Sequence, residues 1–109
     1  QVNPLDKFWI NQDGLYFEDL AVSGKLELAE GTIYEYVTID AKGRRLGEPQ
    51  QITGEKLQVP ISDSVKSDAY FGLRLRTKRR GGDWSLPTSV YCYAWAPGKY
   101  QIVRVERVD

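Results

Sequence analysis

The 109-residue sequence contains no histidine, and this absence excludes several kinds of enzyme. Histidine is the most frequent general base and a frequent metal ligand, so Ser-His and Cys-His nucleophile pairs and most zinc sites are excluded. Pairs of acidic residues remain, such as Glu18 with Asp19 and Asp63 with Asp68. Neighbouring side chains of a strand point to opposite faces, and acids in loops are normally solvated. We therefore expect no carboxylate active site, and we predict that the protein is not an enzyme.

Recognisable metal and phosphate sites are missing as well. Acidic residues lie in or beside the expected loops, but no segment has the D-x-[DN]-x-[DN]-G spacing of a calcium loop. The glycines are scattered singly, apart from Gly81-Gly82, so the sequence contains no phosphate-binding loop of the P-loop or dinucleotide type. We expect the protein to bind no metal ion and no cofactor.

There is one cysteine and no methionine. Cys92 has no partner for an internal disulfide and lies on the small, apolar face of its expected strand, so we predict that it is a buried hydrophobic residue. Because methionine is missing at position 1 too, we expect a processed chain or an excised piece of a longer protein. The uncharged apolar runs are too short to cross a bilayer, so we expect no insertion into a membrane.

The sequence has no excess of positive or negative charge. Lys and Arg together number 15, Asp and Glu together number 15, and the formal net charge is zero. A protein that binds mainly by neutralising phosphates needs an excess of positive charge, so we expect no nucleic acid partner. The length and the hydrophobic content of 41% are ordinary for one globular domain with a single core.

Turn-forming residues recur roughly every ten residues, a spacing typical of an all-β sandwich or barrel. No helix is required anywhere in the chain. The segment 44–53 is polar and contains Pro49, so we interpret it as an edge strand or an extended loop. The segment 62–68 is expected to be a polar crossover. The other strands that we expect lie at residues 8–10, 15–22, 25–29, 32–40, 56–61, 71–78, 90–95 and 100–108.

The segment 69–95 has the clearest pattern, because it reads as two alternating strands joined by a tight turn at Gly81-Gly82. One face of the first strand carries Phe71, Leu73, Leu75 and Thr77, and the other carries Gly72, Arg74, Arg76 and Lys78. On the second strand, Val90, Cys92 and Ala94 share one face, and Tyr91, Tyr93 and Trp95 share the other.

The expected strand 32–40 also alternates. Its apolar face carries Ile33, Val37 and Ile39, and the other face carries Tyr34, Tyr36 and Thr38. β-branched and aromatic residues of this kind pack well on a pleated surface. Because Glu35 shares the apolar face, we expect that end of the strand to lie near the rim of the core.

The order and character of these strands resemble a fibronectin type III domain over residues 25–95. The segments that carry the resemblance are 34–39 for a C-type strand, 57–61 for an E-type strand, 71–77 for an F-type strand, and 84–88, Trp-Ser-Leu-Pro-Thr, leading into a G-type strand. Members of this family usually have a tyrosine that closes a corner at the start of the F strand. Here the residue that alternates in step with the inward-facing residues of this strand is Phe71, and Tyr70 lies one position away.

We therefore predict a single domain, residues 1–109, that is an all-β, antiparallel, fibronectin type III-like β-sandwich of about seven to nine strands. Its parts are a fibronectin-like core at 25–95, an N-terminal hairpin at 1–24 and an additional C-terminal strand at 99–109. The resemblance implies a non-catalytic structural or recognition module of a larger protein or assembly, such as an adhesin, a secreted glycan-degrading enzyme or a phage tail. It implies an extracytoplasmic location or a cell or virion surface, and a protein or a glycan as the partner.

One row of aromatic side chains is a candidate binding surface. Tyr91, Tyr93 and Trp95 repeat at roughly 7 Å along one strand face, and Trp84 lies toward the turn that precedes them. If these rings are exposed, they form a strip on which a carbohydrate-binding module would stack sugars. The alternatives are that the rings face the core, or that the expected strand 100–108 covers them.

A basic stripe follows the preceding strand and its turn. The outer face of an antiparallel strand must be polar, which explains such a stripe without any partner. The alternative is a site for an anionic partner. In the first case, acidic residues elsewhere would pair with the stripe across strands, and Glu35 on the neighbouring strand is one candidate. The basic residues concerned are Arg74, Arg76, Lys78, Arg79 and Arg80.

A third hypothesis concerns the last expected strand. The segment 100–108, which begins at Tyr100 and ends at Val108, would pair edge to edge with a second copy of the chain. The protein would then be a subunit of a homo-oligomer.

Overall fold

The computed structural model describes residues 3–22, 28–61 and 65–107. Within these ranges the chain forms eight β-strands and one short 3-10 helix, η1 (Leu20–Val22). No helix in these ranges is long and apolar enough to cross a membrane. The strands are β1 (Leu5–Asn11), β2 (Gly14–Asp19), β3 (Thr32–Ile39), β4 (Gln50–Gln51), β5 (Gln58–Val59), β6 (Ala69–Arg79), β7 (Thr88–Ala96) and β8 (Lys99–Arg107).

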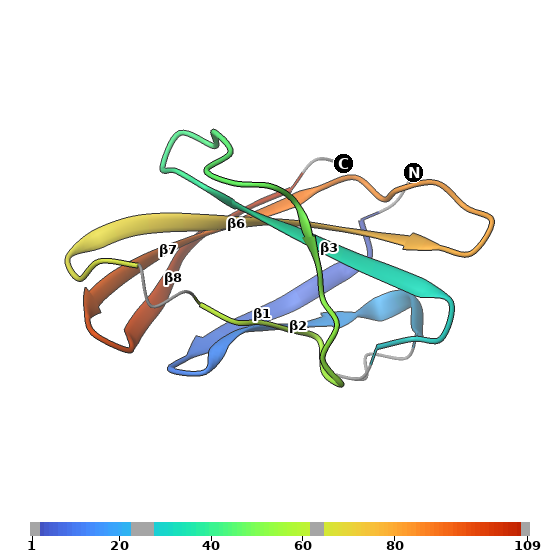
Figure 1. Ribbon diagram of the computed structural model, residues 1–109, viewed down its shortest axis with the longest axis horizontal. Coiled ribbons are helices and arrows are strands. Elements are labelled where there is room, and N and C mark those ends of the chain that lie inside the picture. The colour runs from blue at the N-terminus through green and yellow to red at the C-terminus, as the bar shows by residue number, and fades with distance from the viewer. Residues whose placement is uncertain (1–2, 23–27, 62–64, 108–109) are drawn as a thin grey trace.

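The strands form two antiparallel sheets that face each other. The smaller sheet has the order β1-β2-β5, and the larger has the order β4-β3-β6-β7-β8. Figure 1 shows β3, β6 and β7 in one layer and β1 and β2 in the other. The predicted all-β antiparallel sandwich is confirmed, and its strand order is compatible with an immunoglobulin-like or fibronectin type III-like fold. The β1–β2 hairpin supplies two of the three strands of the smaller sheet.

The main core lies between the two sheets. Cys92 is fully buried there, as predicted, and burial raises the pKa of its thiol to about 12. Full burial of an aliphatic or aromatic side chain contributes about 1.5–3 kcal/mol, so the register of the strands that carry these residues is strongly specified. The buried members of the core are Leu5, Leu15, Phe17, Tyr34, Ile52, Leu57, Val59, Phe71, Leu73, Leu75, Val90, Cys92 and Ala94.

The strand β3 buries side chains on both of its faces. Tyr34 is only 1% exposed and packs in the main core. Val37 and Ile39 lie on the opposite face, where they form a second cluster with Tyr91 on the outer side of the larger sheet. The face that also carries Glu35 is therefore the outer face, and the aromatic face of this strand supplies the main core.

The strand β2 is shorter than expected. It ends at Asp19 and not at residue 22, because the chain then turns into η1. The Asp19 carboxylate accepts a hydrogen bond of 3.0 Å from the Ala21 N–H, a local side-chain bond that competes with the strand ladder.

Three other expected segments have outcomes that differ from one another. Only Gln58–Val59 of the expected strand 56–61 pairs with β2, because Pro60 has no N–H to extend the ladder. The expected strand 25–29 lies mainly outside the described residues, and its last two residues are not in a strand. The segment 44–53, interpreted as an edge strand or an extended loop, contains the two-residue strand β4 at the edge of the larger sheet, and most of its other residues are in no strand.

The predicted Gly-Gly turn joins β6 to the segment before β7. The Gly82 N–H donates a hydrogen bond of 2.9 Å to the Arg79 carbonyl, and Gly81 has a φ of 75°. The chain reverses at this point, since Lys78 and Trp84 form an isolated bridge. Regular pairing along β7 begins only at Thr88, after a proline.

Candidate functional site

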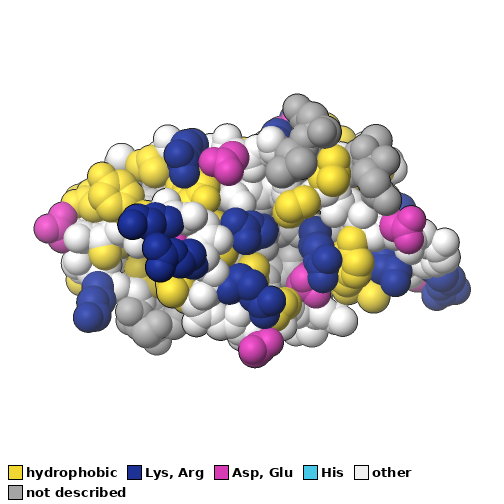
Figure 2. All heavy atoms as spheres, turned by 90° about the horizontal axis from the view of Figure 1, so that it is seen from above, with side chains coloured by type: hydrophobic (Ala, Val, Ile, Leu, Met, Phe, Trp, Pro, Cys, Tyr) yellow, Lys and Arg dark blue, Asp and Glu magenta, His cyan; other side chains and the backbone are white. Residues whose placement is uncertain are grey.

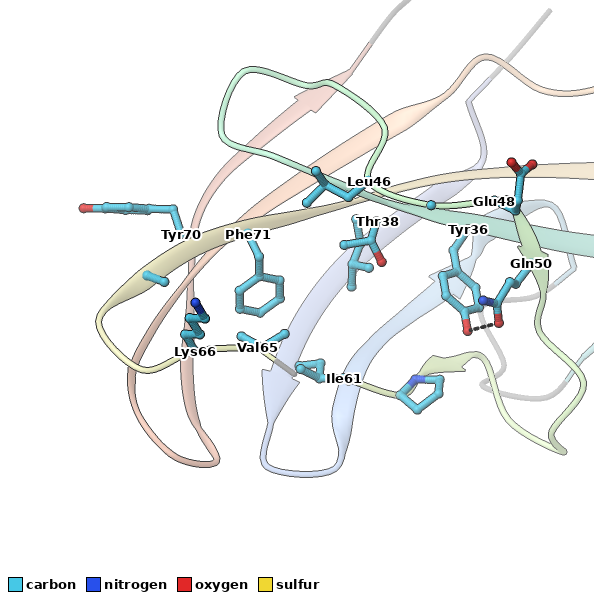
Figure 3. A pocket seen from close by; sticks show the side chains of 14 residues that line it. Tyr36, Thr38, Leu46, Glu48, Gln50, Ile61, Val65, Lys66, Tyr70 and Phe71 are labelled. Atoms are coloured by element: carbon cyan, nitrogen blue, oxygen red, sulfur yellow. Dashed lines mark hydrogen bonds between the residues drawn. The ribbon is translucent and has the colours of Figure 1, made fainter. Parts of the chain in front are cut away.

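An open groove of about 600 Å³ lies between the core face of the larger sheet and the described residues Pro60, Ile61, Val65 and Lys66, which lie between β5 and β6 in the chain (Figure 3). Tyr36 and Thr38 of β3 and Phe71 of β6 line its sheet side, and Ile61 and Val65 line the other side. A volume of about 300–1,000 Å³ is typical of ligand sites. The groove is therefore a candidate binding site.

The groove is open because the two sheets differ in width. The strand β5 pairs with β2 over two residues only, and the proline that follows cannot continue the ladder. The larger sheet has five strands and the smaller sheet has three. In the described part of the chain, part of the core face of β3 therefore has no strand opposite it.

The two ends of the groove carry opposite charges (Figure 3). Lys66 lies at one end, and Gln50 lies at the other, beside Tyr36. Glu48 stands at the rim of this second end, and its carboxylate points away from the groove (Figure 3). The Tyr36 hydroxyl donates a hydrogen bond of 3.3 Å to the Gln50 side chain. Glu48 also contacts Arg45 at 3.4 Å, but its side chain is 93% exposed, so this ion pair is weak and the carboxylate is accessible.

Two exposed hydrophobic residues lie near the groove, and their side chains point in different directions. Leu46 is 62% exposed and stands at the opening, on the connection between β3 and β4 (Figure 3). The ring of Tyr70 points away from the groove. The alternation of apolar and polar residues in the sequence does not identify the groove. The one hint in the sequence is Leu46, an apolar residue between Arg45 and Gly47 in a polar segment.

Tyr91 and Tyr93 of the aromatic row on β7 lie on the outer face of the larger sheet, so their rings do not face the main core. Tyr91, the first member of the row, is nevertheless only 7% exposed. The Arg104 guanidinium on β8 lies 4.2 Å from the centre of the Tyr91 ring. A Cβ atom at Gly43 would lie 3.2 Å from the Tyr91 hydroxyl, so the connection between β3 and β4 also packs against this ring. Tyr91 is therefore covered and does not offer a face to a ligand.

The other two members of the row lie in different surroundings, so the row does not form a continuous strip. Tyr93 packs against Tyr70, with ring centres 4.9 Å apart. Its hydroxyl donates a hydrogen bond to Asp68, and this bond raises the pKa of Tyr93. Trp95 is 54% exposed and lines a hollow beside the β1–β2 turn.

Trp84 lies at the other end of the β6–β7 hairpin from Trp95. The Arg76 guanidinium lies 4.0 Å from the centre of its ring, and the Lys78 ammonium lies 5.9 Å from it. A cation–π contact of this kind contributes about 0.5–1 kcal/mol at an exposed site. The four aromatic residues that the sequence suggests as one site therefore lie in separate environments.

Part of the basic stripe is engaged within the protein. Arg74 donates hydrogen bonds of 3.1 Å to the Ser89 hydroxyl and 3.0 Å to the Gly43 carbonyl. Arg76 forms an ion pair of 2.7 Å with Glu35, which confirms the candidate cross-strand pair. These contacts hold both arginines against the sheet.

The last residues of the basic stripe lie on different faces of the sheet. Arg79 lies opposite Thr32 and contacts the buried carboxylate of Asp19. Lys78 stays on the outer face, and Arg80 is exposed in the turn. Figure 2 shows Lys and Arg side chains gathered on one face, with acidic side chains among them. Internal pairing and solvation explain this arrangement without an anionic partner.

The structure describes three of the four acidic residues that the sequence analysis grouped in pairs. Glu18 forms an ion pair of 3.5 Å with Lys7, whereas Asp19 is fully buried. Asp63 lies outside the described residues, and Asp68 accepts a hydrogen bond from a tyrosine. Across the ranges that the structure covers, no group of three or more His, Cys, Asp or Glu side chains could hold a metal ion.

Comparisons of the chain with protein-family models, with curated proteins and with solved structures find no match. The groove, the separated aromatic residues and the paired arginines are therefore interpreted from their own geometry.

Proposed function

We propose that the protein is a non-catalytic recognition module that binds an extended peptide segment of a partner protein in the groove. It would be one module of a larger extracytoplasmic or surface-associated protein or assembly, and its sandwich would be of the fibronectin type III kind. The observation that carries the proposal is the groove of about 600 Å³ on the uncovered core face of β3 and β6.

The strand order supports the likeness to fibronectin type III domains. In immunoglobulin-type sandwiches, strands A, B and E share one sheet, and strands C, F and G share the other. Here β1, β2 and β5 share one sheet, and β3, β6 and β7 are neighbours in the other. The β1–β2 hairpin then takes the places of A and B, and β8 is an added strand beyond G. The corner tyrosine of such domains is replaced by Phe71, which is buried, and the adjacent Tyr70 is 64% exposed.

The lining of the groove favours an extended peptide. Phe71 and Leu73 are 6% and 4% exposed and form its deep part, with Tyr36 beside them. An extended chain projects every second side chain to one face, at a spacing of roughly 7 Å. Apolar side chains at those positions would bury surface against this lining, at about 25 cal/mol per Å².

The charged ends of the groove favour a peptide with an acidic residue near Lys66 and a basic residue near Glu48. Both side chains lie at the rim, where charges contribute more to orientation and to the association rate than to affinity. The peptide is therefore expected to bind in one direction.

The test uses two fluorescein-labelled short peptides of equal composition with alternating leucines. One has an aspartate at the N-terminal end and a lysine at the C-terminal end, and the other has the reverse order. Fluorescence anisotropy should show that the protein prefers one of them. The double variant Glu48→Lys/Lys66→Glu should reverse that preference. Equal binding of the two peptides by both proteins, or binding of neither peptide, would contradict the proposal.

A pair of substitutions locates the binding surface. Val65→Glu places a charge on the groove wall and should weaken binding about tenfold. The matched control is Val103→Glu on β8, where the side chain is 46% exposed, and this change should leave the affinity unaltered. Equal losses in the two variants would place the peptide elsewhere.

The position of β8 at the edge of the larger sheet, among the described strands, favours a second candidate function, a homo-oligomer joined edge to edge. β8 is the last strand of the larger sheet, and Val105 on it is 39% exposed. A charged residue or a bulge on an edge strand opposes such pairing, and this strand carries charged residues and a register shift. Light scattering at high concentration tests the candidate. A dimer that Val105→Lys dissociates would support it, and a monomer would reject it.

A further inference from the structure

Independently of the groove, we propose that Trp95 forms the base of a site for a neutral sugar ring at the end of a glycan. The site is a shallow hollow of about 360 Å³ between two turns that belong to different sheets. The residues that surround Trp95 are Asn11, Gln12 and Asp13 at the β1–β2 turn, and Gly98, Lys99 and Tyr100 at the β7–β8 turn.

The strand ladder gives Trp95 its direction. Ala94 lies opposite Tyr100, and Ala96 lies opposite Lys99, so Trp95 is the extra residue of a bulge in β7. A bulge bends its strand and redirects the side chain that it carries. Instead of continuing the outer-face row, Trp95 lines the hollow and keeps 54% of its surface exposed.

The polar side of the hollow is held in place by contacts of the β1–β2 turn. A Cβ atom at Gly14, where φ is +147°, would lie 2.3 Å from the Val59 carbonyl oxygen, so the turn packs closely on β5. The Asp13 N–H donates a hydrogen bond of 2.8 Å to the Asn11 side chain. The Gln58 side chain donates one of 2.9 Å to the Asp13 carbonyl. These bonds fix the backbone of the turn and use no atom of the Asp13 carboxylate.

The chemistry of the hollow fits a sugar. A pyranose presents C–H groups on its face, which pack against an indole ring, and hydroxyls at its edge, which bond to amides, carboxylates and ammonium groups. Asn11 and Gln12 supply amides, and the opposite charges of Asp13 and Lys99 favour a neutral ligand over an anion. The polar residues around the hollow are poor partners for the apolar side chains of an extended peptide.

A tryptophan reporter tests the site directly. The sequence has three tryptophans, so the double variant Trp9→Phe/Trp84→Phe leaves Trp95 as the only one. The full chain is titrated with maltotetraose, cellotetraose, mannotetraose, chitotetraose and galactobiose. We expect the emission of Trp95 to shift with at least one of them, because a sugar ring over the indole removes water from it. No shift with any of the five would overturn the proposal.

Substitutions in the otherwise unchanged chain separate stacking from polar recognition. Trp95→Ala should weaken binding about tenfold in titration calorimetry, and Asp13→Asn should weaken it less. The matched control is Trp84→Ala, which removes a surface tryptophan at the far end of the hairpin and should leave the affinity unchanged. Circular dichroism checks that each variant is folded. Affinity retained by folded Trp95→Ala, or lost equally in Trp84→Ala, would overturn the assignment.

Discussion

Tyr34 on β3 donates a hydrogen bond of 2.7 Å to the Asp19 carboxylate on β2, and this bond joins the two sheets inside the core. Arg79 on β6 contacts the same carboxylate oxygen, and the Ala21 N–H donates to the other. Asp19 is fully buried, and a buried charge is tolerated only when it is paired and hydrogen-bonded. Asp19, Tyr34 and Arg79 therefore form a polar lock between the sheets.

Removing the carboxylate of the polar lock should destabilise the fold. Breaking a buried ion pair costs about 3–5 kcal/mol, but the Arg79 side chain is 36% exposed and regains water, so we expect a loss of about 2–3 kcal/mol for Asp19→Ala. Tyr34→Phe removes one hydroxyl and should cost about 1–2 kcal/mol. Urea denaturation measures both. The matched control is Asp13→Ala in an exposed turn, and a loss for Asp19→Ala no larger than this control would contradict the lock.

Alkaline pH should weaken the fold through Tyr34. Burial, and then its hydrogen bond to Asp19, raise the pKa of the Tyr34 hydroxyl well above the ordinary value of 10.0. Stability from a group whose pKa is raised on folding is fully present below the pKa of the unfolded chain and is lost as the pH rises above it. We expect the free energy of unfolding to fall above about pH 10, and to fall less steeply in Tyr34→Phe. Urea denaturation across this range measures the slopes, and equal slopes would refute the assignment.

The strands β6 and β7 could be predicted from the sequence because the alternation that sets their register is visible within each strand. Phe71 and Leu73 alternate with polar or small residues, and Cys92 alternates with large aromatic ones, so one face of each strand is distinct. The strand β3 lacks this contrast, since Tyr34 on one face and Val37 on the other are both suited to burial. The contact of Tyr34 with a distant strand decides between the two faces.

Trp95 is a candidate from the sequence, but the shapes of the candidate sites could not be predicted, because they depend on contacts between segments far apart in the sequence. Tyr91 is covered by Arg104 from β8 and by the backbone at Gly43. Trp95 is redirected by a bulge that exists only in the pairing of β7 with β8. The groove results from where β5 ends relative to β3. None of these is a periodic property of a single strand.

Cys92 should react with a thiol reagent only when the chain unfolds. It lies on the core face of β7 between Phe71 and Ile102, fully buried, and burial raises the pKa of the thiol to about 12. The reactive thiolate is therefore scarce at neutral pH. Labelling by Ellman's reagent should follow the unfolding rate and accelerate with urea. Gln101→Cys in a Cys92→Ala background gives the exposed reference. Labelling of native Cys92 as fast as this reference would reverse the assignment of the two faces of β7.

Among the glycines that the structure describes, Gly14 should be the least tolerant of a side chain. A Cβ atom there would lie 2.3 Å from the Val59 carbonyl oxygen, and the φ of +147° disfavours any side chain. We expect Gly14→Ala to cost about 3 kcal/mol or more, because both strain and a backbone clash oppose it.

The matched control for Gly14→Ala is Gly54→Ala, where a Cβ atom would have nothing within 4 Å, and we expect a change within about 0.5 kcal/mol. Thermal denaturation measures the difference, since 1 kcal/mol shifts the Tm of a domain of this size by about 4–8 °C. Equal Tm values would show that the β1–β2 turn does not pack on β5. A large loss for Gly14→Ala alone would agree with close packing of the turn on β5, as expected if the polar side of the Trp95 hollow is in place before a ligand binds.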